Sequence, residues 1–175
     1  MTLTLAIPSA TDAEAISAAA ETSFKATFAH LYPPEDLASF LTGWMPPQKV
    51  AAQITDPEWA IRVVRDAAGA VAGYIKLGPV DFDLPEGEPD PADSIELHQL
   101  YLLPAAQGSG AATLLMDWAL AEARARGKAR VYLSVYIDNI RAQRFYARYG
   151  FHEIGKNAFR VGNTIDDDRI WRCDL

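Results

Sequence analysis

Leu100-Tyr-Leu-Leu-Pro-Ala-Ala-Gln-Gly-Ser-Gly-Ala-Ala-Thr-Leu-Leu115 is the stretch from which the fold can be worked out. An apolar run typical of a β-strand ends at Pro104, a short loop with two glycines follows, and an amphipathic helical pattern begins without a break. The first turn of a helix leaves several N–H groups unpaired and carries about half a positive charge. Glycine lets an anion approach those N–H groups without a Cβ in the way. The stretch therefore predicts a site for a phosphorylated ligand.

Composition narrows the class of protein. The chain has 175 residues, of which 50% are hydrophobic, and this predicts one globular domain over residues 1–175. A formal net charge of −7 argues against nucleic acid or an anionic membrane surface as the main partner. No apolar run approaches the roughly 20 residues of a membrane span. The short apolar N-terminal stretch lacks a basic region and is interpreted as a strand rather than a signal peptide, so we expect a cytoplasmic protein.

The remaining elements follow from periodicity and from turn residues. Leu3, Leu5 and Ile7 alternate as in a strand, Asp12 is a plausible N-cap, and Gly127 and Gly150 are expected to end helices. The segment 78–93, with four prolines, six acidic residues and no base, is interpreted as a long solvated hairpin loop. The predicted helices cover about 12–29, 35–41, 47–54, 111–126 and 139–149, and the predicted strands cover 3–7, 59–65, 71–77, 94–103, 129–135, 151–156 and 169–174. This order predicts an α/β (α+β) fold with a mixed, mostly antiparallel sheet flanked by helices.

Two common phosphate sites do not fit the loop. A Walker-type loop needs Gly-Lys-Ser/Thr, whereas Gly110 is followed by Ala111 and Ala112. A dinucleotide fingerprint needs a third glycine where Thr113 stands and an acidic residue at the end of the next strand, and neither is present. The single cysteine, Cys173, provides neither an internal disulfide nor a zinc ligand set, and no metal is predicted.

Two spaced motifs resemble the GNAT superfamily of acetyl-CoA-dependent N-acetyltransferases. The segment 107–112 fits Gln/Arg-x-x-Gly-x-Gly/Ala after the strand run Glu96-Leu-His-Gln-Leu-Tyr-Leu102, and Asn139-Ile-Arg-Ala-Gln-Arg-Phe-Tyr146 follows downstream. Thr27-Phe-Ala-His-Leu-Tyr-Pro33, Gly73-Tyr-Ile-Lys-Leu77 and Phe159-Arg-Val-Gly162 are similar to a bacterial branch that includes polyamine N-acetyltransferases. The resemblance implies acetyl-CoA as co-substrate and a splayed pair of central strands that admits it.

The resemblance also implies where the cofactor binds. The pyrophosphate is expected on backbone N–H groups of the loop and of the helix start. The backbone of Leu102 is expected to pair with the pantetheine amides, and the Leu100 N–H to polarise the thioester carbonyl. Asn139 is expected to cap its helix and is also a cofactor-binding candidate. The loop residues predicted to bind the cofactor are Gln107, Gly108, Ser109, Gly110, Ala111 and Ala112.

Two side chains are candidates for catalysis. An alkylammonium has a pKa near 10.4, so a base must remove its proton before attack. Some GNAT enzymes have a general-base glutamate at the position of Glu96, and by this resemblance Glu96 is the candidate base, often acting through water. A solvent-facing or ion-paired glutamate is the alternative, and His98 shares its strand face as a possible assisting base. By resemblance, Tyr146 directs its phenol to the CoA sulfur as general acid and also contacts the cofactor.

The acceptor and the phosphate-binding cations remain open at this stage. The loop itself carries no base, so Arg141, Arg144 and Lys76 are alternatives for the phosphates. The predicted function is acetyl transfer to a primary amine of a small molecule, possibly a polyamine. Alternatives are a protein N-terminal or lysine acetyltransferase and a non-catalytic acyl-CoA-binding module. A homodimer is a possible assembly.

Overall fold

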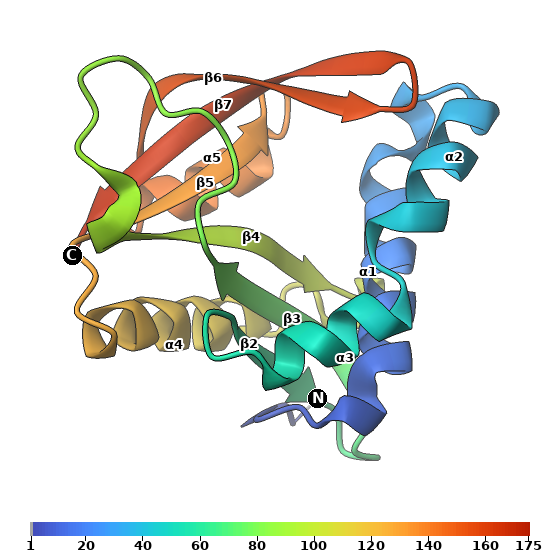
Figure 1. Cartoon of the computed structure of the whole chain (residues 1–175). Coiled ribbons are helices and arrows are strands. Elements are labelled where there is room, and N and C mark those ends of the chain that lie inside the picture. The colour runs from blue at the N-terminus through green and yellow to red at the C-terminus, as the bar shows by residue number, and fades with distance from the viewer. Residues whose placement is uncertain (1) are drawn as a thin grey trace.

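The computed structural model describes residues 2–175 and contains a seven-stranded sheet in the order β1-β2-β3-β4-β5-β7-β6 (Figure 1). Neighbouring strands are antiparallel except for β4 and β5, which are parallel. The strands are β1 (Thr4–Ala6), β2 (Ala60–Arg65), β3 (Val71–Gly78), β4 (Ser94–Leu102), β5 (Arg130–Tyr136), β6 (His152–Val161) and β7 (Thr164–Asp174). The α-helices are α1 (Ala13–Phe28), α2 (Pro34–Trp44), α3 (Pro47–Thr55), α4 (Ala111–Ala125) and α5 (Ile140–Ala147). The predicted mixed, mostly antiparallel sheet flanked by helices is confirmed.

Helices cover both faces of the sheet, and each face has its own core. On one face, the buried side of α4 packs against the middle strands through Leu115, Met116 and Ala119. On the other, α1 and α3 pack against β2 and β3 around Ile16, Val50 and Tyr74. We call this second side the α1 face. Among residues 2–175, no helix is both long and apolar enough to span a membrane.

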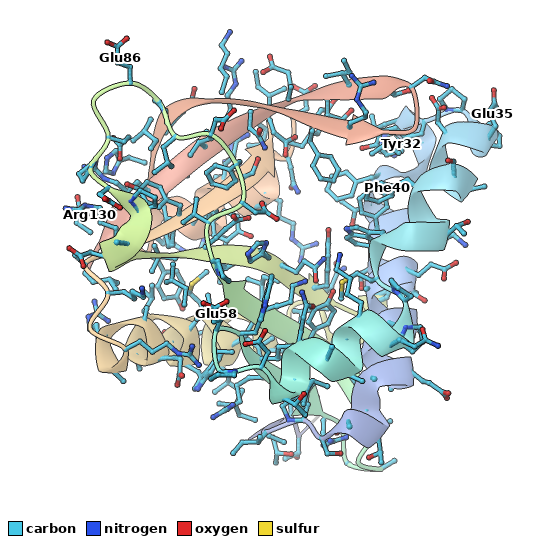
Figure 2. All side chains as sticks on the ribbon, viewed as in Figure 1. Tyr32, Glu35, Phe40, Glu58, Glu86 and Arg130 are labelled. Atoms are coloured by element: carbon cyan, nitrogen blue, oxygen red, sulfur yellow. The ribbon has the colours of Figure 1, made fainter. Side chains whose placement is uncertain are left out.

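An aromatic cluster joins α1 and α2 to the β6–β7 hairpin. Phe24, Tyr32 and Val161 are buried at its centre, and Tyr32 and Phe40 lie between the helices and the hairpin in Figure 2. The buried Asp36 carboxylate accepts hydrogen bonds from the Asn163 N–H (3.0 Å) and the Thr164 hydroxyl (2.9 Å) in the hairpin turn. These bonds hold the pKa of Asp36 below its usual value and fasten the start of α2 to the hairpin.

The predicted helix ends are largely confirmed. Gly127, with φ +69°, follows α4 in the left-handed conformation that favours glycine, and the Asn139 side chain accepts from the Ala142 N–H (3.2 Å) to cap α5. Asp12 does precede α1, but its side chain does not cap the helix. Instead it accepts from the Ser9 N–H (2.8 Å) and pairs with Arg65 (2.8 Å).

The interpretation of segment 78–93 as a solvated loop is wrong in part. Figure 1 shows the segment arching from β3 toward β6 and β7 before it returns to β4. The Glu88 carboxylate accepts from Arg172 (3.0 Å) and from the Tyr132 hydroxyl (2.7 Å), so the segment is fastened to β5 and β7. Strands β6 and β7 are also longer than predicted, because polar residues such as Asn157 and Asp166 interrupt the apolar pattern of a hairpin that is nevertheless continuous.

Gly73 is required where β3 and β4 meet. A Cβ there would overlap Leu102 Cδ2 and lie 2.7 Å from the Tyr101 carbonyl oxygen. We expect Gly73→Ala to lower the free energy of unfolding by about 1–3 kcal/mol, the usual cost of overpacking, as measured by urea denaturation. Gly43→Ala is the matched control, because a Cβ at Gly43 in α2 meets nothing within 4 Å. A neutral Gly73→Ala would contradict this packing.

Candidate active site

The central feature of the site is a gap between β4 and β5. The two strands pair only where Ser94–Glu96 meets Arg130–Tyr132. Beyond Glu96 and Tyr132 no ladder joins them, although β4 continues to Leu102 and β5 to Tyr136. Backbone amides in the middle of a sheet normally find partners, so this divergence leaves a place where an extended ligand can pair with β4. The predicted splayed strand pair is confirmed.

The amides of Leu100 and Leu102 face this gap. The Leu103 N–H donates to the Ala72 carbonyl (2.9 Å), toward β3. Because consecutive N–H groups of a strand point to opposite sides, Leu102 and Leu100 direct theirs away from β3. The Leu102 carbonyl shares that side and accepts from the Ser23 hydroxyl of α1 (3.2 Å).

At the end of β4, the loop before α4 presents a cradle of backbone N–H groups. Within residues 2–175, the amides of Gly108, Gly110, Ala112 and Thr113 donate to no protein acceptor. Gly108 (φ +77°) and Gly110 (φ +87°) are left-handed, and a Cβ at either would meet nothing within 4 Å. The cradle is thus open, and its N–H groups suit a phosphate group.

One cation joins the cradle from α5. Arg141 Nη1 donates to Gln107 Oε1 (2.8 Å), which places a guanidinium beside the loop. Lys76, another predicted alternative, instead points to Gln53 of α3 (3.3 Å) and to the Trp59 ring (4.9 Å to the centroid). Arg144 lines the same cavity as the loop. Among these alternatives, the contacts favour Arg141 for the phosphates.

Tyr146 approaches from the α4 side of the sheet. Its ring packs against Phe145 and Phe151, with centroids 5.7 and 5.8 Å away. Its hydroxyl makes no hydrogen bond to residues 2–175, and burial raises its pKa to about 12. A phenol with so high a pKa keeps its proton and can donate it to a strongly basic atom.

Glu96 lies on β4, buried in a hydrogen-bonded cluster. Its Oε2 accepts from the Asp81 N–H (3.0 Å), and its Oε1 lies 3.2 Å from His98 Nδ1. His98 Nε2 lies 2.8 Å from the Pro79 carbonyl, which can only accept, so Nε2 carries a proton. When His98 is neutral, its Nδ1 is an acceptor that faces the Glu96 carboxyl group.

Burial shifts the pKa values of both Glu96 and His98. It raises the pKa of Glu96 to about 8 and lowers the pKa of His98. Burial also lowers the pKa of the nearby Lys76 to about 8. A carboxylate with a raised pKa is a stronger base than an ordinary glutamate. Ligand atoms of Asp81, Glu96 and His98 lie within 4.8 Å of one another, a spacing that a metal ion could also use.

Across the gap, β5 and β7 present a second polar group. Asp168 accepts from the Ser134 hydroxyl (3.0 Å), and Asp166 accepts from the Tyr32 hydroxyl. These residues and Glu96 line the part on the α1 face of one cavity of about 1240 Å³, which also includes the loop before α4 and part of α5. Sequence reasoning missed Asp166, Ser134 and the cavity-lining Tyr101, although the alternation Asp166, Asp168, Ile170 is a period-two signal of one strand face.

The sequence is similar to one family model and to individual proteins. Residues 21–151 match the family model described as the Acetyltransferase (GNAT) family. An uncharacterized N-acetyltransferase of Mycobacterium tuberculosis is 38% identical over 165 residues, which cover 94% of this chain and 99% of that protein. An uncharacterized N-acetyltransferase of Lactobacillus delbrueckii subsp. lactis is 29% identical over 153 residues, with 87% and 86% covered.

Solved structures share the fold at low sequence identity. The PaiA N-acetyltransferase of Thermoplasma acidophilum, crystallised with coenzyme A, has a TM-score of 0.77 at 21% identity, with 100% of each chain covered. The ribosomal-protein-S18-alanine N-acetyltransferase of Escherichia coli has a TM-score of 0.71 at 18% identity, with 99% of this chain and 94% of that chain covered.

The N-H cradle yields a direct binding test. Gly110→Asp places a carboxylate against the anion site, and we expect the affinity for CoA, measured by calorimetry, to fall by roughly 100-fold. Gly69→Asp is the matched control, because Gly69 is also left-handed (φ +82°), is equally open, and lies in the β2–β3 turn. Unchanged CoA affinity in Gly110→Asp would contradict the phosphate assignment.

Proposed function

Because this chain belongs to the GNAT family of acetyltransferases, we propose that it transfers the acetyl group of acetyl-CoA to a primary amine of a small molecule. The observation that carries the proposal is the gap between β4 and β5, bounded by an N-H cradle at one end and by buried acid–base groups beside it. We further propose that residues 1–175 act as a single N-acetyltransferase domain.

Backbone and side-chain groups of the protein are placed where they can bind acetyl-CoA, the acetyl donor. Acetyl-CoA, when bound, supplies the acetyl group as a thioester. The cradle amides of Gly108, Gly110 and Ala112 would hold its phosphates, together with Gln107, Ser109 and Ala111 of the same loop. The backbone of Leu102 would bind the pantetheine, and the Leu100 N–H would donate to the thioester oxygen as charge develops on it. Asn139 would act mainly through the α5 cap, which keeps Tyr146 in place.

Glu96 is the proposed base. The acceptor nitrogen can attack only after it has lost a proton, and an ordinary carboxylate takes that proton poorly from an ammonium of pKa near 10.4. Burial raises the pKa of Glu96 to about 8, which reduces the difference between its pKa and that of the ammonium group. Since both carboxylate oxygens already have protein partners, the proton would reach Glu96 through a water molecule.

Tyr146 is the proposed acid. Departure of CoA leaves a thiolate, which needs a proton. The free Tyr146 hydroxyl, with its pKa raised to about 12 by burial, stays protonated until that thiolate forms. It approaches from α5, on the opposite side of the sheet from Glu96, so base and acid do not compete for one position.

The walls of the cavity favour a small acceptor over a polypeptide. On one side, Asp36 and Tyr32 fasten the helices to the β6–β7 hairpin. On the other, Glu88 fastens segment 79–93 to Arg172 and Tyr132. Both sides of the cavity are thus held by contacts of buried or half-buried residues.

Glu96→Gln tests the base. We expect kcat/KM for amine acetylation to fall by about 100- to 10,000-fold. In the unmodified protein kcat/KM should rise with pH through about 8, because the base works only when ionised, and Glu96→Gln should lose this step. The exposed Glu58→Gln is the charge-matched control. Retention of the step in Glu96→Gln would refute the assignment, and inhibition by EDTA would instead support metal binding at Asp81, Glu96 and His98.

Tyr146→Phe tests the acid. We expect kcat to fall by about 100-fold or more while CoA affinity changes little, since the ring packing is kept. Tyr149→Phe is the control on the same segment, because the Tyr149 hydroxyl bonds to Asp117 (3.0 Å) at the surface.

A panel of acceptors separates the alternatives. Small amines, lysine peptides and free peptide N-termini are assayed by CoA release. Turnover with peptides alone would point to a protein acetyltransferase. Normal CoA binding without any turnover would point to a non-catalytic acyl-CoA-binding module.

A further inference from the structure

Three side chains that can ligate a metal converge where segment 78–93 begins beside β4. His98 Nδ1 lies 3.2 Å from Glu96 Oε1 and 3.8 Å from Asp81 Oδ2, and all three atoms lie within 4.8 Å of one another. Two ligands of a tetrahedral zinc ion, each about 2.0–2.2 Å from the metal, lie roughly 3.3–3.6 Å apart. A small shift of the exposed Asp81 side chain would therefore let one ion of this size contact all three atoms.

The His98 imidazole is held in an orientation that suits a metal ligand. Its Nε2–H donates to the Pro79 carbonyl (2.8 Å), and its ring packs against Trp59 with centroids 4.8 Å apart. A histidine ligand commonly donates its second ring N–H to a carbonyl in this way, which fixes the tautomer and leaves the other nitrogen free. The His98 side chain is only 9% exposed, and its Nδ1 is directed at carboxyl oxygens of Glu96 and Asp81. Since ionised carboxylates can only accept, this buried nitrogen needs a cation between itself and them.

The charges of the two carboxylates are not balanced by a basic side chain. Within residues 2–175, neither Asp81 nor Glu96 forms an ion pair with a lysine or an arginine. Lys76 lines the same cavity but directs its ammonium to Gln53 (3.3 Å). The Asp81 N–H holds Glu96 Oε2 (3.0 Å), which leaves Oε1 facing His98. The Asp81 side chain is 71% exposed, so an ion can reach the cluster from solvent.

We propose that Asp81, Glu96 and His98 bind a divalent transition-metal ion of the zinc type, and that this ion inhibits acetyl transfer by occupying the base. One imidazole nitrogen and two carboxylate oxygens form a donor set that suits zinc. A carboxylate whose charge is engaged by zinc takes up a proton poorly, so Glu96 acts as the base in the metal-free protein only. This inference rests on the proposed function, because it names the regulation of the same site.

Calorimetry with Zn²⁺ alone gives the first test. We expect one zinc ion to bind to each chain of the unmodified protein. Asp81→Asn and His98→Asn each remove one ligand and should each weaken binding by at least about tenfold. Asp83→Asn is the matched control, because Asp83 is an exposed carboxylate of the same segment. No zinc binding to the unmodified protein, or binding that both ligand variants retain in full, would overturn the inference.

Titration of the activity with zinc gives the second test. The acetylated amine is measured by mass spectrometry, because the thiol of released CoA also binds zinc. We expect kcat/KM to fall by about 100-fold or more, as for Glu96→Gln, with a midpoint near the calorimetric Kd. Relative to its own metal-free rate, Asp81→Asn should need at least about tenfold more zinc for the same inhibition, and Asp83→Asn should not. Full activity of the zinc-bound protein, stimulation by zinc, or loss of activity after EDTA treatment would overturn the inference.

Failure of this inference can be distinguished from failure of the proposed function. If the protein acetylates amines and zinc neither binds at the cluster nor inhibits, the function stands and the metal site is refuted. If the protein binds CoA but acetylates no amine with or without zinc, the function is refuted. The calorimetric comparison of the unmodified protein with Asp81→Asn and Asp83→Asn then decides the metal site by itself.

Discussion

The rest of the site depends on the early divergence of β4 from β5. Parallel pairing lasts only from Ser94 to Glu96, and the strands then separate. The separation leaves the Leu100 and Leu102 amides without a neighbouring strand and opens a passage between the two faces of the sheet. The N-H cradle lies where β4 ends, so an extended ligand held by the strand meets the anion site at the same end. Tyr146 and Glu96 reach the passage from opposite sides. A continuous ladder between β4 and β5 would remove all of these features together.

The two faces of the sheet differ in what they bury: one buries an apolar core, and the other buries charged groups as well. The α4 side is a continuous apolar core, with Leu115 and Leu133 among its buried residues. The α1 face instead buries charged groups, among them Lys76, Glu96 and Asp168. Burial of such groups is unfavourable and shifts their pKa values toward neutrality, which suits proton transfer but does not stabilise the fold. The apolar core on the other side offsets that cost, and proteins commonly concentrate unfavourable local choices at functional sites.

Contacts between distant segments hold the walls of the proposed acceptor cavity. Asp36 holds the hairpin turn, Tyr32 reaches Asp166, and Glu88 reaches Arg172. Each of these contacts joins residues more than 80 positions apart in the chain. They fasten α2, the turn before it and segment 78–93 to the β5–β7–β6 part of the sheet. The proposed acceptor cavity thus depends on contacts between segments that are distant in the chain. The N–H cradle depends only on a strand, a glycine loop and a helix that follow one another in the sequence.

The sequence by itself determined the local features. Periodicity and turn residues gave the order of strands and helices, Gly127 gave the end of α4, and Gly108 and Gly110 gave the anion cradle, because each depends on residues adjacent in the chain. The motifs containing Glu96 and Tyr146 could be named for the same reason. Only the tertiary structure decided that segment 78–93 is fastened to β5 and β7, that Glu96 lies 3.2 Å from His98, and that Lys76 contacts Gln53 rather than the loop. It also decided that Asp168 is buried with its Oδ1 unpaired among residues 2–175. Those properties depend on burial and on partners far away in the chain, and a linear pattern records neither.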